Sequence, residues 1–169
     1  MSKRDLKKYL NDLTKEQVQE QIFELYDKFG DVKTYYDFVF NPREDKLAGE
    51  AKSKIANEYF PVKSKRPKLR RSVAQKYIKH FIVLGVDAFS TADVMLYNLE
   101  IAQKYSAKRE VRYLSFYKSM QNSFDQAMQY VVSNGLGEEM LNRLIAIVDE
   151  AVKQKWENAS HFQSVIENL

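Results

Sequence analysis

Glycine and proline are scarce in this chain of 169 residues, which contains five glycines and three prolines. A β-sandwich or β-barrel needs a turn about every 8–12 residues, and so few turn-forming residues cannot supply them. Apolar residues recur instead at helical spacing through most of the chain, as in the segment from Val18 to Phe29. The sequence therefore predicts an all-α fold, with about eight helices in a single domain over residues 1–169.

Capping signals place several helix boundaries. Thr14 followed by Gln17 predicts one helix N-terminus, and Asp87 predicts another. We expect a further helix to begin near Lys68, and a C-terminal helix to carry Trp156 in its buried stripe. Short connections favour an orthogonal or up-down bundle. The alternative is a short α-solenoid of helix pairs, although no residue pattern recurs along the chain.

Composition excludes several classes of protein. The sequence has no cysteine, so disulfides and thiolate chemistry are excluded. No apolar run follows the basic N-terminal residues, as a secretory signal would require, and no stretch approaches the roughly 18 apolar residues of a membrane-spanning helix. Aromatic residues make up 13% of the chain, too many for a disordered protein. We expect a cytoplasmic protein with no membrane partner.

Positive charge is concentrated between residues 61 and 86, where the sequence has no Asp or Glu. The cations of this segment, which begins in a predicted basic loop at 60–67, are Lys63, Lys65, Arg66, Lys68, Arg70, Arg71, Lys76 and Lys79. Cations near a helix N-terminus oppose its macrodipole, which favours a phosphate or acidic partner for this basic patch. The alternatives are a solvated loop, or a loop paired with the acidic C-terminal helices. Tyr77 and Phe81 are expected on the buried face, so no exposed aromatic platform is predicted.

Four aromatic residues are crowded into the segment 31–40: Tyr35, Tyr36, Phe38 and Phe40. On one helix they cannot all face the same side, because Tyr35 and Phe38 share one side while Tyr36 and Phe40 share another. Such a helix is either central to the bundle, which we favour, or half-exposed at a contact surface for a partner or a second copy.

No catalytic or metal-binding motif is visible. Asp93 is four residues before Tyr97, a spacing that fits either a buried hydrogen-bonded pair or a site. His80 has no ligand partner at helical spacing, and His161 has only Glu157, which is too few ligands for zinc. The sequence has neither a nucleophile motif nor a phosphate-binding loop. We therefore predict no enzyme activity, no metal and no cofactor.

Several segments resemble a family of small bacterial proteins that is catalogued only as a domain of unknown function. They lie between residue 2 and about residue 134: Ser2–Leu10, Val32–Asp45, Arg70–Phe81, Leu84–Gln103 and Ser115–Met120. The resemblance implies an all-helical bacterial domain. It implies no activity, cofactor or catalytic residue.

Two functional hypotheses follow from the residues. The preferred one is a non-enzymatic protein-interaction or scaffold domain, whose ligand is an unknown protein or a second copy of the chain. The alternative is a nucleic-acid-binding protein without sequence preference that uses the basic segment 63–79. A single continuous positive face would favour nucleic acid, whereas a basic loop folded onto the acidic C-terminal helices would favour a structural role.

Overall fold

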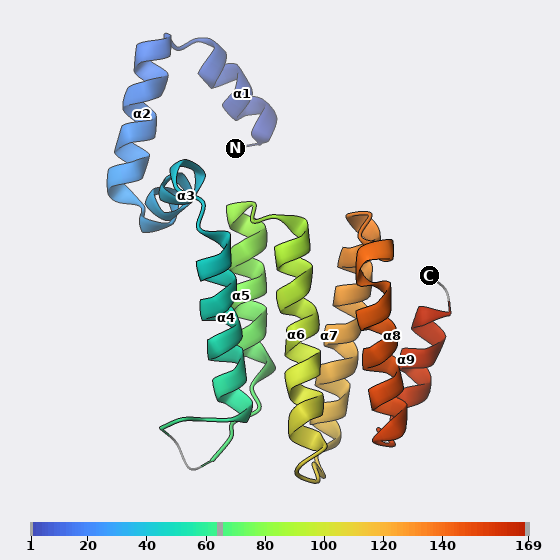
Figure 1. Ribbon diagram of the computed structural model, residues 1–169. Helices are drawn as coiled ribbons and strands as arrows, with labels where there is room; N and C mark the ends of the chain where they lie inside the picture. Colours follow the sequence, from blue (N-terminus) through green and yellow to red (C-terminus); the bar gives the residue numbers. More distant parts are fainter. Residues whose placement is uncertain (1, 64–65, 168–169) are drawn as a thin grey trace. The chain divides into compact units, whose positions relative to one another are not determined.

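A computed structural model describes residues 2–63 and 66–167. Within these ranges the chain forms nine α-helices and no β-strand, which confirms the all-α prediction. The helices are α1 (Lys3–Asn11), α2 (Lys15–Lys28), α3 (Gly30–Phe40), α4 (Glu44–Tyr59), α5 (Arg71–Leu84), α6 (Ala88–Ser106), α7 (Leu114–Ser133), α8 (Gly137–Lys153) and α9 (Ala159–Ile166) (Figure 1). None of these helices combines the length and apolar character needed to cross a membrane.

Local capping explains several helix ends. At the start of α2, the Thr14 hydroxyl accepts a hydrogen bond from the Gln17 backbone N–H, and the Gln17 side chain accepts one from the Thr14 backbone N–H. The Asp87 carboxylate accepts from the Ser90 N–H at the start of α6. Gly85 ends α5 with φ 74°, a left-handed conformation that glycine adopts at little cost. The predicted capping positions at Thr14 and Asp87 are therefore confirmed.

Two predicted boundaries are wrong. Helix α5 begins at Arg71 rather than near Lys68, because Leu69 adopts φ 53° and the backbone N–H groups of Lys68 and Leu69 donate to the Glu58 carbonyl. Trp156 lies beyond the end of α8, yet its side chain is buried. A contact distant in sequence therefore sets the start of α5, whereas α8 ends in a local turn in which Lys155 adopts φ 55° and the Trp156 N–H donates to the Ala151 carbonyl.

Contacts divide the chain into two compact units, with the division between Arg43 and Glu44. The first unit contains α1, α2 and α3, and none of its described residues is buried. The Gln21 amide donates to the Tyr9 hydroxyl, and the Tyr26 hydroxyl donates to the carboxylate of Asp37. Polar contacts between exposed side chains therefore link these helices. The prediction of one domain over 1–169 stays a prediction.

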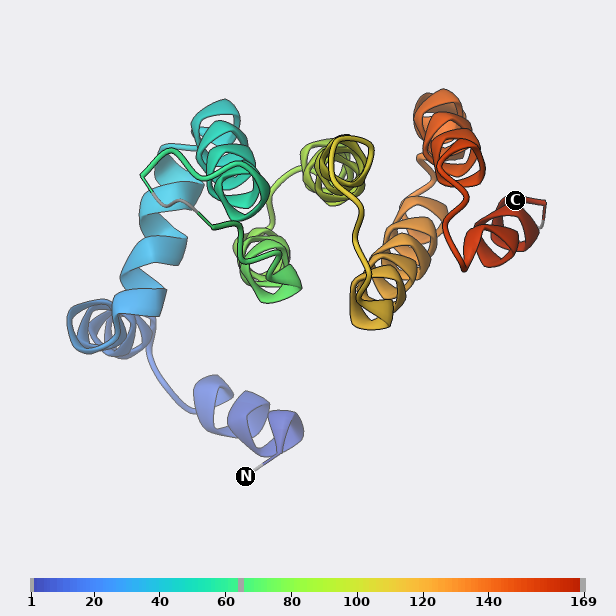
Figure 2. The ribbon, with the colours of Figure 1, turned by 90° about the horizontal axis from the view of Figure 1, so that it is seen from below.

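The second unit contains α4 to α9 in two layers. Figure 2 shows α4, α6 and α8 in one layer and α5, α7 and α9 in the other. Helices within a layer run in the same direction, and successive helices run in opposite directions (Figure 1). An antiparallel bundle and a stack of helix pairs share this alternation. Helix α6 contacts α4, α5, α7 and α8, and it supplies eleven buried residues to the core.

Candidate functional site

Three connections of the second unit lie at one end of its helices. Because α4, α6 and α8 run in one direction, the described residues of the connections that follow them, 60–63 and 66–70, 107–113 and 154–158, come to the same end (Figure 1). We call this end the basic end, because its described connections carry eight cations and only two carboxylates. The cations are Lys63, Arg66, Lys68, Arg70, Lys108, Arg109, Arg112 and Lys155, and the carboxylates are Glu110 and Glu157.

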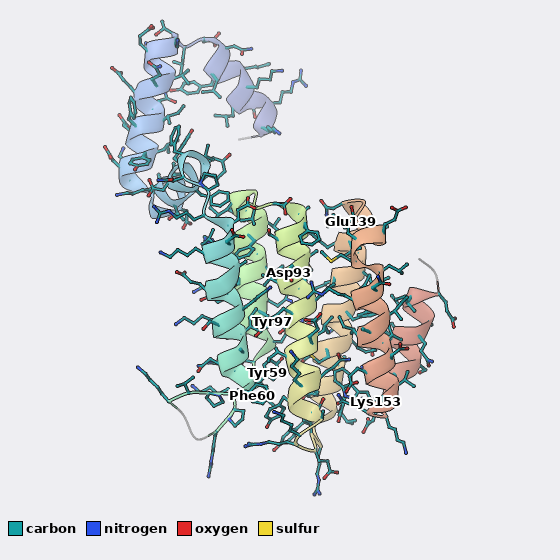
Figure 3. The ribbon with its side chains drawn as sticks, in the orientation of Figure 1. Tyr59, Phe60, Asp93, Tyr97, Glu139 and Lys153 are labelled. Atoms are coloured by element: carbon teal, nitrogen blue, oxygen red, sulfur yellow. The ribbon has the colours of Figure 1, made fainter. Side chains whose placement is uncertain are left out.

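The opposite end of the second unit is acidic. Helices α4, α6 and α8 begin there, and their N-terminal regions carry Glu44, Asp45, Asp87, Glu138 and Glu139. These carboxylates have a local explanation, since negative charge stabilises a helix N-terminus. Figure 3 shows Glu139 and Lys153 at opposite ends of α8. Charge is thus separated along the helix direction, and this separation arises only when distant segments fold together.

Two residues of the predicted basic patch have structural partners. Arg70 donates from Nε and Nη2 to the two carboxylate oxygens of Glu58, which is 7% exposed. Arg71 donates from Nε to the Ser123 hydroxyl and from Nη2 to the Gln126 side-chain oxygen, both on α7. These bonds hold the start of α5 against α4 and α7. The ion pair therefore joins this segment to α4, rather than to the acidic C-terminal helices.

The other cations of the predicted patch lie in two places. Three are exposed in the connection 60–70: Lys63, Arg66 and Lys68. Lys76 and Lys79 are exposed further along α5, and Lys79 lines a groove between α5 and α7. Lys65 lies outside the described residues. The cations of the first group are therefore joined at the basic end by those of 107–113, which the sequence analysis did not single out.

Aromatic rings link the connections 60–70 and 107–113. The Phe60 and Tyr105 rings meet edge to face, 5.8 Å between centroids. The Lys108 ammonium lies 5.7 Å from the Phe60 ring centroid, and the Arg109 guanidinium lies 5.9 Å from that of Tyr105, both within cation–π range. Tyr113 is 71% exposed beside these cations in sequence. Phe81 is buried and Tyr77 half-buried, as predicted for α5, whereas exposed rings come to the basic end from neighbouring segments.

A groove of about 550 Å³ lies between α6 and α8 and extends to the basic end. Its apolar lining includes Phe60, Ala107, Ala146 and Ile147, and its charged lining comprises Glu100, Lys104, Lys108, Arg143 and Glu150. Figure 3 shows Phe60 and Lys153 on either side of the C-terminal part of α6. A second groove of about 570 Å³ lies between α5 and α7 in the other layer, and it contains Ile82, Val83 and Met95.

Asp93 joins three helices of one layer. Its carboxylate pairs with Lys52 of α4 and with Arg143 of α8, and Arg143 also donates to Glu100 at 2.9 Å. Burial raises the pKa of Asp93, but the hydrogen bonds from Lys52 and Arg143 outweigh it, so the net pKa is lowered. Asp93 therefore has these two cations, rather than Tyr97, as partners. Tyr97 lies beneath the Lys52 ammonium, which is 5.5 Å from its ring centroid.

The aromatic residues of α3 form a cluster without becoming buried. Tyr35 and Tyr36 meet edge to face at 5.5 Å, and Tyr36 stacks on Phe40 at 6.2 Å. Tyr35 is 44% exposed and Phe40 is 81% exposed, while Tyr36 and Phe38 are half-buried. Helix α3 is therefore not enclosed in a core, contrary to the favoured interpretation of its pattern, and two of the four rings remain accessible.

The two histidines are far from any set of metal ligands. His161 Nε2 lies 2.7 Å from a carboxylate oxygen of Asp125 on α7, rather than near Glu157. His80 is exposed on α5. Among the described residues, no three side chains of the His, Cys, Asp and Glu types lie close enough together to hold a metal ion.

Comparison with known proteins identifies one family. A family model described as "Family of unknown function (DUF6155)" matches residues 1–169. Comparisons with curated proteins and with solved structures give no significant match.

Proposed function

Because the chain belongs to the DUF6155 family, whose function is unknown, we propose a function from the geometry: the protein binds single-stranded nucleic acid at the basic end, without sequence preference and without catalysing a reaction. One observation carries the proposal. Three connections that are distant in sequence bring eight cations and two carboxylates to the same end of the second unit, and seven of these cations remain when Arg70, the partner of Glu58, is set aside. A polyanion is the ligand that best fits such an excess of exposed positive charge.

The location of the acidic residues supports this proposal. A solvated or structural basic loop has no reason to collect further cations from 107–113 and 154–158. The carboxylates of the helix N-terminal regions, Glu44, Asp45, Asp87, Glu138 and Glu139, are at the other end of α4, α6 and α8. Furthermore, α5, α7 and α9 begin at the basic end without an acidic residue in the first turn and without a side-chain cap. Their dipoles add to the positive potential there.

Exposed rings favour a single strand over a duplex. Proteins that bind single strands without sequence preference combine cations along the backbone with aromatic rings that stack on bases. Tyr113 and Phe60 are 71% and 38% exposed, and both belong to the segments that carry the cations. The bases of a duplex are already stacked on one another, so these rings would contribute little to its binding.

A filter-binding or fluorescence titration tests the proposal. A fluorescent dT20 strand is titrated with protein at 50 and 200 mM salt. The test variant changes Lys63, Lys68, Lys108 and Arg112 to Gln, and it spares Arg70 and Arg71, whose loss would disturb folding. The charge-matched control changes Lys46, Lys54, Lys76 and Lys79 to Gln, four exposed residues on α4 and α5 of the same unit, outside the three connections.

We expect steeply salt-dependent binding by the wild type, unchanged in the control. Each phosphate contact contributes a slope of about −0.7 on single strands, so the test variant should reduce the log–log slope by about 3. Tyr113→Ala should weaken binding without changing the slope, since a base stack is worth about 1–3 kcal/mol. No binding by the wild type at 50 mM salt, or equal losses in test and control variants, would refute the proposal.

The second candidate is a non-enzymatic protein-interaction or scaffold domain. The groove between α5 and α7 favours it, because Ile82 and Val83 are 52% and 64% exposed along that groove. Contiguous exposed apolar surface often marks a protein contact. Light scattering at increasing concentration tests for a second copy as partner. Self-association that Ile82→Asp abolishes, together with the absence of nucleic-acid binding, would favour this candidate.

A further inference from the structure

The groove between α6 and α8 has a distinctive distribution of polar groups. Glu100 lines the groove together with apolar Ala146 and Ile147, and Lys104 and Lys108 lie one and two turns further along, on the last turn of α6 and just beyond it, toward the basic end. Glu150, on the last turn of α8, lies toward the same end and accepts hydrogen bonds from Lys153 and Gln154. A ligand that matches this order has hydrogen-bond donors on an apolar body at one end and negative charge at the other.

The Glu100 carboxylate is held in place by Arg143 and has one oxygen that can accept a further hydrogen bond. Its Oε1 atom accepts from Arg143 Nε at 2.9 Å, and Arg143 is itself fixed by a second bond to Asp93 at 2.8 Å. Its Oε2 atom accepts no hydrogen bond from a described residue. The Glu100 side chain is 28% exposed, so this oxygen needs no partner in the free protein and can take one from a ligand.

An aromatic ring lies at the end of the groove nearer the connections. Phe60 lines the groove and packs edge to face against Tyr105, with the Lys108 ammonium 5.7 Å from its ring centroid. The groove volume of about 550 Å³ is large enough for a nucleotide, since ligand pockets range over about 300–1,000 Å³.

Peptides match this arrangement less well than a nucleotide does. An acidic peptide would place carboxylates against Glu100 and Glu150, and a basic peptide would be repelled by Lys104, Lys108 and the rest of the basic end. A nucleotide has both required parts. The exocyclic amino group of adenine, cytosine or guanine donates to a carboxylate, its ring contacts apolar side chains, and its phosphate is attracted by lysine.

We infer that the groove between α6 and α8 binds one nucleobase of the strand, with the Glu100 carboxylate accepting from the base and Lys104 and Lys108 contacting its phosphate. This inference rests on the proposed function for the strand. Free nucleotides have the same chemistry, so they test the groove separately. At this one base position the groove adds a preference to a strand contact that is otherwise independent of sequence: bases with an exocyclic amino group should be preferred over thymine, which has none.

The test uses a variant that fills the groove without changing its charge. Ala146 is exposed and lines the groove, so Ala146→Phe occupies the space of the base. Ser133→Phe is the matched control, because Ser133 is exposed and lines the other groove, between α5 and α7. Three probes are titrated: dA12, dT12, and an abasic sugar-phosphate chain of the same length. Adenosine 5′-monophosphate is titrated in parallel, with binding followed by calorimetry.

We expect the wild type to bind dA12 about a hundredfold more tightly than the abasic chain, about tenfold for a base stacked on Tyr113 and about tenfold for the base in the groove, and more tightly than dT12. Ala146→Phe should reduce the advantage of dA12 over the abasic chain by about tenfold, leave abasic binding unchanged, and abolish binding of the mononucleotide. Ser133→Phe should behave as the wild type.

Two failures are distinguishable. If no strand binds but the mononucleotide binds and Ala146→Phe abolishes this, the proposed function is wrong and the groove is a nucleotide site. If strands bind with equal affinity to the abasic chain, or if Ala146→Phe leaves both the dA12 preference and the mononucleotide binding intact, the groove does not hold a base and the inference is overturned.

Discussion

Arg70 and Glu58 form a two-point ion pair in which Nε and Nη2 of the guanidinium each donate to one carboxylate oxygen at 2.8 Å. The Glu58 side chain is 8% exposed, whereas that of Arg70 is 52% exposed. The buried partner therefore depends on the exposed one. This geometry assigns Arg70 to folding, although its position in a run of cations suggested a ligand contact.

Arg70→Gln should destabilise the protein by about 1–3 kcal/mol, because it leaves a buried carboxylate with fewer donors. Lys68→Gln is the control: it removes the same charge from an exposed side chain, and it should change stability by less than about 0.5 kcal/mol. Urea unfolding followed by circular dichroism measures both. Equal, small effects would show that the ion pair contributes little.

The free energy of unfolding should decrease at acidic pH as carboxylates in ion pairs become protonated. Hydrogen bonding from Arg70 lowers the pKa of Glu58 below its usual 4.5, and the net pKa of Asp93 is below its usual 3.8. A carboxylate whose folded pKa is lowered contributes stability above its unfolded pKa, and this is lost as pH falls through the folded value. We therefore expect unfolding free energies to be level from pH 7 to 5 and to decrease below about 4.5.

The Glu58→Gln variant should show a shallower decrease over the same range, because one of the titrating groups has been removed. Urea midpoints at half-unit pH intervals make this comparison. A wild type whose stability decreases mainly between pH 7 and 5 would contradict the assignment to these carboxylates.

Arg143 should be a stabilising residue at the centre of a charged network. It donates to Asp93 and Glu100 of α6 from α8, and its side chain is 32% exposed. Arg143→Gln should cost about 1–3 kcal/mol, since two partly buried carboxylates lose a donor. Arg112→Gln removes an arginine whose pair with Glu110 is highly exposed, and it should have almost no effect on thermal unfolding. A similar shift in both variants would refute a special role for Arg143.

Thr91→Val should be neutral or stabilising. Thr91 is fully buried in α6, and its hydroxyl oxygen has no hydrogen-bond partner among the described residues. Replacing an unsatisfied buried hydroxyl by a methyl group of similar size removes a desolvation cost, with an expected gain of up to about 1 kcal/mol. Thr34→Val is the contrasting control. The Thr34 hydroxyl donates a hydrogen bond to the Gly30 carbonyl at 2.8 Å, so its replacement should not stabilise the protein. Destabilisation by Thr91→Val would reveal a bond to water.

Most helices could be predicted from the sequence because their determinants are local. The spacing of apolar residues specifies which segments become helical, and the Thr14–Gln17 capping box and the Asp87 cap act within one turn. The start of α5 was predicted wrongly because a distant contact decided it. Helix α5 starts late because the Glu58 carbonyl accepts from the Lys68 and Leu69 backbones.

At the candidate site, too, some features can be predicted from the sequence and others depend on contacts between distant segments. The charge of the segment 61–86, including Lys63 and Lys68, is visible in the sequence, and so is the absence of cysteine and of catalytic motifs. Sequence order alone cannot show that Lys108 and Arg112 join these cations, that the Lys108 ammonium lies against the Phe60 ring, or that Arg70 is paired with Glu58. Those relationships depend on the direction in which each helix runs and on which side chains meet between layers. The sequence by itself therefore determined the helices and the total charge, whereas the tertiary structure decided which charges act together, because electrostatic fields depend on distances in space rather than on separation along the chain.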